Sequence, residues 1–199
     1  MSNSLVSELI CTRLSHDIVG NVGAVANAVE LLEEGDMDFI DDIKSILNVS
    51  SKTLSARLKF FRMTFGLDNL NLGNVDIVKK TAQDYLLTLG NKDFPINLVF
   101  NITEYRNVKN ALLLIMIMGD ILIRGGNIII EDNQNSLSVK IDKNEKLSTD
   151  KLEKIKFYLS APNQCGDAGL APLVALYEYN SDKKIKLVQN DTNIMIVVE

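Results

Sequence analysis

The residue best suited to carry out chemistry in this chain is His16, its only histidine. A neutral imidazole is a competent nucleophile, and histidine is the side chain that changes charge close to neutral pH. Apolar residues recur around it at steps of three and four, which predicts a long amphipathic helix with the stripe Cys11, Leu14, Ile18, Val22, Val25, Val29 and Leu32. At about 100° per residue, His16 lies roughly 160° from both Leu14 and Ile18. We therefore expect an exposed imidazole on the side of this helix.

Small residues follow His16 on the same side of the predicted helix. Val19, Gly20 and Gly23 lie one or two turns further along the chain. A glycine inside a helix costs about 1 kcal/mol relative to alanine, so two of them close together indicate a compensating benefit. Close approach by another protein is the simplest such benefit.

Two long helices are expected to carry and position this histidine. The first covers residues 4–34 and ends at Gly35, and the second covers residues 36–66 with Asp36 as its N-cap. Because the connection is short, the helices should be antiparallel neighbours. They cannot by themselves bury both their shared stripe and the flanking apolar residues, which are Leu5, Leu9, Val19 and Phe60. We expect a homodimeric four-helix bundle to cover these residues; the alternative is that the second half of the chain covers them.

The second half of the chain differs from the predicted hairpin in its sequence pattern. Residues 67–74 are rich in Asn and Gly and are interpreted as a linker. Helices are expected at 75–89, 107–123, 149–159 and 172–179, and strands at 96–102, 127–131, 136–141, 184–189 and 193–198, with a polar turn at 132–135. This order predicts helices packed on one face of a mixed sheet. The expected fold class is α+β, with a helical hairpin at 1–66 and an α/β sandwich at 75–199.

Composition excludes several classes of protein. The net charge is −5, which gives no basic face for nucleic acid. The two cysteines, Cys11 and Cys165, fit neither a disulfide framework nor a zinc site, so a reduced cytoplasmic location is expected, with Cys11 in the core. No signal peptide is indicated at the N-terminus. The longest apolar run, residues 111–123, contains Asp120 and is shorter than the roughly 20 residues that cross a bilayer, so it is interpreted as a buried helix and no membrane association is expected.

The histidine motif resembles the phosphoacceptor helix of histidine kinases. The resemblance lies in residues 14–17 (LSHD), the small residues that follow, and residues 30–33 (ELLE). Within that group the chain resembles the ChpT-type histidine phosphotransferases of the alphaproteobacterial cell-cycle phosphorelay. The likeness extends to residues 60–66 (FFRMTFG) at the end of the second helix. More loosely it covers the whole chain, because the second half is similar to a kinase ATP-binding domain in its order of elements.

The chain departs from the kinase pattern where a nucleotide would bind. Kinase ATP-binding domains use an Asn-bearing helix for Mg²⁺ and phosphates, an Asp-x-Gly-x-Gly motif for adenine, and a glycine-rich lid. Here the corresponding helix reads ALLLIMIMGD at 111–120, and no Asp-x-Gly-x-Gly motif occurs in the chain. The glycine pair Gly166 and Gly169 is interpreted as a helix-entry turn rather than a phosphate cradle. We therefore expect a degenerate domain that binds no ATP, as the resemblance also implies.

The resemblance implies that His16 accepts a phosphoryl group from the receiver domain of a hybrid histidine kinase and passes it to response regulators. No intrinsic cofactor or metal is expected, and Mg²⁺ would be held by the receivers. Phosphoryl transfer needs mainly positioning and charge compensation. Arg13 is the candidate for steadying the phosphoryl oxygens, and Asp17 is the candidate either for holding the other ring nitrogen or for contacting the partner. The candidate partner-binding residues are Gly20, Asn21 and Gly23.

Other interpretations of these residues are open. Arg13 and Asp17 can be ordinary surface charges, and His16 can be an ordinary exposed histidine. Four basic residues of the second helix can attract the acidic surface of a receiver domain or can form an ordinary solvated helix face; they are Lys52, Arg57, Lys59 and Arg62. At the level of the whole protein, the alternatives are an active histidine kinase, which the missing nucleotide motifs oppose, and a non-catalytic dimeric adaptor. Replacing His16 by Ala separates relay from adaptor, because an adaptor would keep its effect.

Overall fold

The computed structural model describes residues 3–199, except 36–38, 67–71, 134–135, 143 and 163–165. The long hairpin consists of α1 (Asn3–Glu33) and α2 (Ile40–Phe65). The remaining elements are α3 (Val75–Leu87), β1 (Ile96–Asn101), η2 (Tyr105–Asn107), α4 (Val108–Ile121), β2 (Gly126–Asp132), β3 (Leu137–Asp142), α5 (Thr149–Ser160), η4 (Ala168–Leu170), α6 (Ala171–Tyr179), β4 (Ile185–Gln189) and β5 (Asn193–Val198). The expected elements are therefore present in the expected order, which confirms the α+β fold class.

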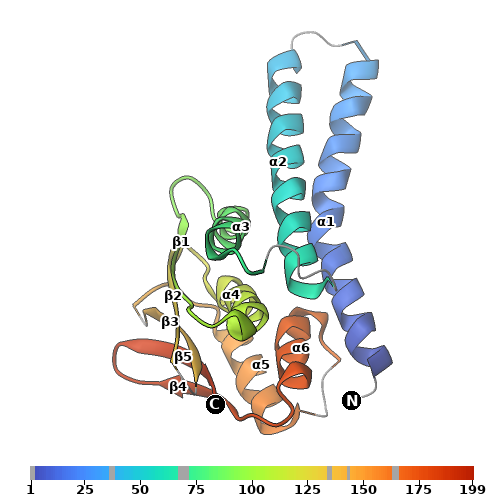
Figure 1. The fold of residues 1–199 in the computed structure, drawn as a ribbon. Coiled ribbons are helices and arrows are strands. Elements are labelled where there is room, and N and C mark those ends of the chain that lie inside the picture. The colour runs from blue at the N-terminus through green and yellow to red at the C-terminus, as the bar shows by residue number, and fades with distance from the viewer. Residues whose placement is uncertain (1–2, 36–38, 67–71, 134–135, 143, 163–165) are drawn as a thin grey trace.

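The first helix of the hairpin ends where its sequence predicts, but the second begins later than expected, at Ile40, with Phe39 rather than Asp36 at its N-cap position. Gly35 follows α1 with a φ of 75°, a left-handed conformation that glycine adopts without steric cost. Asp41 and Asp42 lie in the first turn of α2, where negative charge suits the helix dipole. The expected N-cap Asp36 lies outside the described residues, as do Cys165 and parts of the predicted linker and of the 132–135 turn. In Figure 1 the hairpin extends well beyond the rest of the fold.

The sheet is mixed and is covered by helices on one face. Its strand order is β1-β2-β3-β5-β4; β1 and β2 are parallel and the other neighbours are antiparallel. Side chains alternate between buried and more exposed along β1, β3 and β5, as expected for a sheet with one covered face. The helices α3, α4 and α5 contact the strands, and α6 packs on α4 (Figure 1). This arrangement confirms the predicted layering.

α4 is the central helix of the core. All but two of its residues are buried, and it contacts strands on one side and α6 on the other. This explains its nearly uninterrupted apolar sequence, because a helix that is hydrophobic all round must be buried. The two less buried residues are Lys109 and Asp120. Among the described residues, no helix is long and apolar enough to cross a membrane.

One hydrophobic core joins the hairpin to the second half. Leu9 of α1 and Phe60 of α2 belong to the same buried cluster as the helices over the sheet. Phe60 stacks on Tyr85 of α3 with ring centroids 3.9 Å apart and an interplanar angle of 7°. The expected division into 1–66, 67–74 and 75–199 stays a prediction, but the packing between its two main parts is extensive.

This packing corrects two expectations. Leu5, Leu9 and Phe60 pack into the core that the hairpin shares with the second half of the chain, so they need no second copy of the chain to cover them. Val19 remains 63% exposed. Cys11 is exposed rather than part of the core. The reason is that the covered face of α1 is centred on Leu9, Arg13 and Ala28, so it includes only part of the predicted stripe, and Cys11 lies outside it.

Asp132 joins the end of β2 to the segment that leads into α4. Its carboxylate accepts hydrogen bonds from the Thr103 N and Oγ1 atoms at 2.9 and 2.8 Å, from the Glu104 N atom at 2.8 Å and from the Asn107 Nδ2 atom at 3.2 Å. Burial works to raise the pKa of Asp132, but these hydrogen bonds, the backbone ones first, outweigh it and lower the pKa below its ordinary value.

Replacing Asp132 by Ala should therefore reduce stability in a pH-dependent way. Near neutral pH we expect a loss of about 1 kcal/mol, typical for a side chain that caps free backbone N–H groups. Because the folded-state pKa is lowered, the contribution is complete above the ordinary aspartate pKa and disappears as the pH falls through the folded-state pKa. Urea unfolding at a series of pH values measures this, with the exposed Asp191→Ala as control. A difference from wild type that does not shrink in acid would contradict the interpretation.

Candidate functional site

His16 lies on α1 with 84% of its side chain exposed, which confirms the expected exposure. The helix places it just outside the region where α1 packs against the second half of the chain. Its Nδ1 atom lies 3.5 Å from Oδ1 of Asp17, the next residue. The Nε2 atom is thus the ring nitrogen on the far side from this carboxylate.

Asp17 is held in place by Arg13, one turn earlier on α1. The Nε atom of Arg13 donates to Oδ2 of Asp17 at 2.8 Å. The side chain of Asp17 is only 13% exposed, so its interpretation as an ordinary surface charge is wrong. With Oδ2 bound to Arg13, Oδ1 is the oxygen that faces the imidazole.

Arg13 connects α1 to α4. Its two terminal nitrogens donate to the two carboxylate oxygens of Asp120, at 2.7 and 2.8 Å. One of them also lies 3.4 Å from the carbonyl oxygen of Gly169 in η4. Arg13 is only 9% exposed, so it too is no ordinary surface charge. Its suggested contact with phosphoryl oxygens stays a prediction, and the observed geometry commits the guanidinium to two carboxylates.

The ion pairs keep Arg13 charged despite its burial. Desolvation works against the charge, but the hydrogen bond and the negative charge of Asp120, followed by those of Asp17, outweigh it and raise the pKa of Arg13. Bidentate arginine–carboxylate pairs of this kind are among the stronger hydrogen-bonded contacts in proteins. The pair therefore fixes where α1 crosses α4.

A second arginine, Arg57 of α2, holds the backbone beside the histidine. One terminal nitrogen donates to the carbonyl oxygen of Asp17. Its Nε and its other terminal nitrogen donate to the side chain and carbonyl of Thr88, at 3.1 and 3.3 Å. Arg57 is therefore a link between α1, α2 and the end of α3, and its interpretation as part of a solvated face is wrong.

Sequence reasoning assigned no role in the site to Asp120 or Thr88, and it considered Arg57 only as part of a basic docking surface or a solvated face. Asp120 was visible as the one charged residue in the long apolar run, and such a residue in a buried helix needs a partner. That signal could have indicated an ion pair, although not with which cation. For Arg57 and Thr88 the sequence offers no comparable signal, because their contacts depend on how α2 and α3 cross.

The expected partner-binding residues lie on the outer part of α1. Gly20 and Gly23 are exposed, and a Cβ atom added at either position would meet nothing within 4 Å. Asn21 is half-buried. The protein's own packing therefore gives no reason for either glycine.

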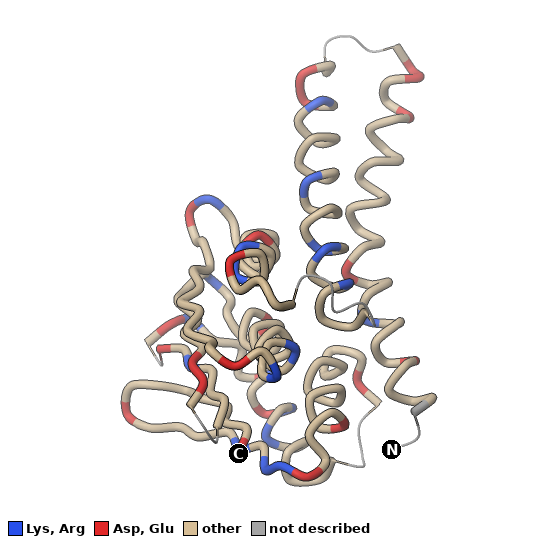
Figure 2. Tube along the Cα trace, in the orientation of Figure 1, with Lys and Arg blue, Asp and Glu red and all other residues tan. Residues whose placement is uncertain are grey.

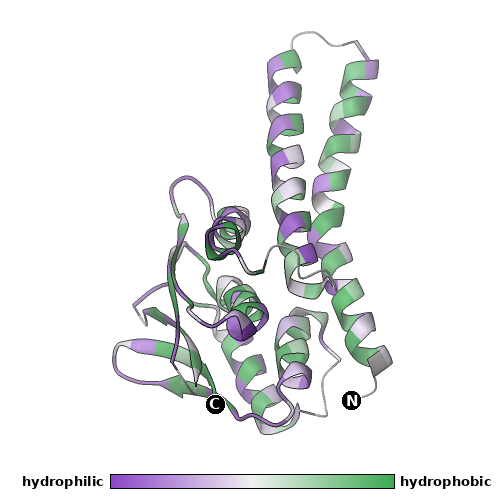
Figure 3. Cartoon of the chain, in the orientation of Figure 1, coloured by the Kyte–Doolittle hydropathy of each residue, from purple (hydrophilic) through white to green (hydrophobic). Residues whose placement is uncertain are grey.

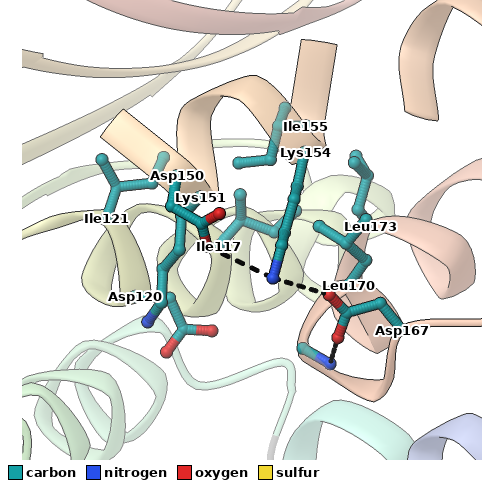
Figure 4. Close-up of a pocket in the computed structure, with 11 residues that line it drawn as sticks. Ile117, Asp120, Ile121, Asp150, Lys151, Lys154, Ile155, Asp167, Leu170 and Leu173 are labelled. Atoms are coloured by element: carbon teal, nitrogen blue, oxygen red, sulfur yellow. Dashed lines mark hydrogen bonds and ion pairs between the residues drawn. The ribbon is translucent and has the colours of Figure 1, made fainter. Parts of the chain in front are cut away.

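A cavity of about 100 Å³ lies on the other side of Asp120, between α4, α5 and the start of α6 (Figure 4). Its charged groups are largely paired with each other, since the Nζ atom of Lys154 lies 3.2 Å from carboxylate oxygens of both Asp150 and Asp167. Asp167 also accepts a hydrogen bond from the Gly169 N atom at 2.7 Å, as the N-cap of η4. This confirms the helix-entry turn for residues 166–170. Within the described ranges, no group of three or more His, Cys, Asp or Glu residues is placed to hold a metal ion.

The fold defines the class of protein that this chain resembles. A solved structure described as a bacterial phosphotransferase aligns with 100% of this chain and 98% of its own, with a TM-score of 0.75 and 25% identity. The histidine kinase AdeS of Acinetobacter baumannii covers 92% of this chain, at 14% identity and a TM-score of 0.39, with 95% of its own chain aligned. No protein-family model matches the chain.

The sequence comparison gives a particular relative. A stretch of 58 residues is 47% identical to the protein phosphotransferase ChpT of Brucella abortus (strain 2308). It corresponds to 29% of this chain and 27% of that protein, so the match spans about a quarter of the relative's length. Together with the shared fold, it confirms the resemblance to ChpT-type phosphotransferases that the histidine motif indicated.

Replacing Arg13 by Ala should strongly destabilise the protein. The variant leaves the carboxylate of Asp120 in a largely buried position without its cation, which typically costs about 3–5 kcal/mol. Urea unfolding measures the loss. As a control, Lys80→Ala removes the exposed Lys80–Asp84 pair and should cost less than about 1 kcal/mol. Equal losses in the two variants would show that the Arg13–Asp120 pair contributes no more than a surface contact.

Proposed function

We propose that this protein is a histidine phosphotransferase of a two-component phosphorelay. His16 accepts a phosphoryl group from an aspartate of a receiver domain and passes it to aspartates of response regulators. The observation that carries the proposal is the single exposed histidine whose Nδ1 faces a held carboxylate, 3.5 Å away. The likeness to ChpT of Brucella abortus and to a solved bacterial phosphotransferase supports it.

The chemical step needs few groups from this chain. The lone pair of Nε2 attacks the phosphorus of the receiver's aspartyl phosphate, so that an N–P bond forms, the P–O bond breaks and the aspartate carboxylate leaves. The imidazole becomes positively charged as this happens, and the Asp17 carboxylate beside Nδ1 compensates that charge. Positioning and charge compensation are the main requirements of phosphoryl transfer. We propose that Mg²⁺ is held by the receivers and that ATP takes no part.

The receiver is proposed to dock on the outer part of α1 beside His16. Gly20 and Gly23 leave this surface open, so a partner can approach the helix backbone closely. The α1 segment between Asp17 and Glu30 carries no charged residue, whereas α2 carries several lysines (Figure 2). Two of these, Lys52 and Lys59, line the groove between α2 and α3 that also includes Thr88. They would attract the acidic phosphorylation site of a receiver domain.

We also propose that the protein is a homodimer through the outer half of the hairpin. Val22 and Val29 lie on one line of α1 and are 51% and 43% exposed, and Leu32 is exposed near them. Much of α1 is apolar even where the hairpin extends beyond the rest of the fold (Figure 3). A second copy would cover this face and form a four-helix bundle. The face lies away from His16, which would stay accessible to a receiver.

The proposed function is tested by phosphotransfer with a purified, phosphorylated receiver domain of a hybrid histidine kinase. We expect label to appear on the wild-type protein, to be absent from His16→Ala, and to pass on to a response regulator. A parallel reaction with ATP alone should give no label. Label from ATP alone would indicate a kinase instead. Binding of the receiver without any labelling of wild type would favour the adaptor.

The homodimer is tested by light scattering of the intact protein. We expect a mass of twice the 22.1 kDa of the chain, and a shift toward the single-chain mass for Val29→Glu, because the new charge would be buried in the bundle. Phe157→Glu, which changes an exposed aromatic residue of α5, is the matched control. A single-chain mass for the folded wild type at micromolar concentration would contradict the dimer.

A further inference from the structure

We propose that Asp120 is a positioning residue for phosphoryl transfer at His16 and acts through Arg13 and Asp17. The inference rests on the proposed function of His16 and extends its site to the central helix of the other half of the chain. Asp120 does not contact the imidazole. Instead, Asp120 determines which carboxylate oxygen of Asp17 remains available to the Nδ1 atom of His16.

The hydrogen-bonding capacity of Arg13 is divided unequally between its two carboxylates. Both terminal nitrogens are bound to Asp120, at 2.7 and 2.8 Å, so the fork of the guanidinium is occupied. The donor that binds Asp17 is Nε, which contacts the Oδ2 atom at 2.8 Å. Asp17 therefore keeps Oδ1 available, and this is the atom that lies 3.5 Å from Nδ1 of His16.

Without the carboxylate of Asp120 this division would change. Arg13 and Asp17 lie four residues apart on α1, so Asp17 is the neighbouring carboxylate that can occupy the vacated fork. Bidentate pairing uses both carboxylate oxygens and is the stronger geometry. Asp17 would then turn toward Arg13, and Oδ1 would leave the imidazole. Asp120 thus competes for Arg13, and this competition keeps Asp17 facing His16.

The position of Asp17 decides which nitrogen of His16 can react. A neutral imidazole carries one proton, and a carboxylate at Nδ1 favours the tautomer with that proton on Nδ1. The lone pair is then on Nε2, where it can attack phosphorus. A separation of 3.5 Å in the free protein can shorten, since hydrogen bonds at reacting groups often tighten only in the complex. Loss of Asp120 should therefore reduce the fraction of imidazole in the reactive form.

Tyr85 of α3 places a buried hydroxyl near this cluster. Among the described residues, the hydroxyl of Tyr85 is buried without a hydrogen-bond partner. Burial, and after it the negative charge of Asp120, raises the pKa of Tyr85, so the hydroxyl stays protonated beside the ion pairs. Phenylalanine at this position would keep the stack on Phe60 without the unpaired group.

The experiment compares Asp120→Asn with the conservative Asp120→Glu in the intact protein. We expect Asp120→Asn to slow transfer from a phosphorylated receiver domain by on the order of 10-fold, as is typical when an outer partner of a reacting group is lost. Asp120→Glu keeps the negative charge and should retain most of the rate. Asp150→Asn is the matched control, because Asp150 lines the same cavity but pairs with Lys154, and it should transfer like wild type.

The decisive comparison repeats Asp120→Asn in an Asp17→Asn background. If Asp120 acts through Asp17, the second substitution should cause no further loss of rate. A merely structural contribution predicts that the two losses multiply, and that result would overturn the proposal. If Asp120→Asn does not fold, the double variant Arg13→Gln with Asp120→Asn, which replaces the ion pair by two amides, takes its place. This variant lacks the guanidinium that would capture Asp17, so it should transfer closer to the wild-type rate than Asp17→Asn does. A rate as low as that of Asp17→Asn would overturn the proposal.

A second readout separates this inference from the proposed function. Nitrogen NMR reports the tautomer of the single histidine without any receiver present. We expect the Nδ1–H tautomer to lose population in Asp120→Asn and to be unchanged in Asp150→Asn. Unchanged signals in Asp120→Asn would overturn the role of Asp120 even if His16 is phosphorylated. Failure of wild type to accept label, with the tautomer shift present, would instead contradict the proposed function.

Discussion

The guanidinium of Arg13 is the contact on which the arrangement of this protein depends. It is largely buried where α1, α4 and η4 meet, and it binds a carboxylate on each of two helices and lies close to a backbone carbonyl. A buried charge is tolerated only when it is paired. The crossing of α1 over α4 can therefore vary little without leaving one of these groups unpaired. His16 is held rigidly as well, because it follows Arg13 by less than one helical turn.

The hairpin has an anchored end and a free end, and His16 lies near the border between them. Toward the N-terminus of α1, the second half of the chain covers the helix, with Leu9 in the common core. Arg57 of α2 holds the backbone of Asp17 and links it to Thr88 at the end of α3. Beyond His16 the helix carries exposed valines and two glycines with open space around them. The imidazole is thus rigidly supported on one side and accessible on the other. That combination suits a group that must be presented to another protein.

Much of the fold could be predicted because its signals are local. Helical periodicity, Gly35 and the alternation along the strands give elements close to those observed, and the exposure of His16 follows from its position relative to Leu14 and Ile18. The burial of Arg13 and the exposure of Cys11 could not be predicted in this way. The covered face of α1, which contacts α6 and η4, is centred on Leu9, Arg13 and Ala28 and overlaps the apolar stripe only in part. Only the three-dimensional crossing brings Asp120 to Arg13.

The shared core limits how far the two halves of this chain are interchangeable. The helical hairpin looks like a module that could be joined to other domains. Yet Arg13 has its principal partner on α4, and Phe60 stacks on Tyr85 of α3. A hairpin moved to a different second half would bring a buried cation and an apolar ring without their counterparts. The two halves must therefore evolve together, and a substitution at position 13 or 120 limits which residues are tolerated at the other position.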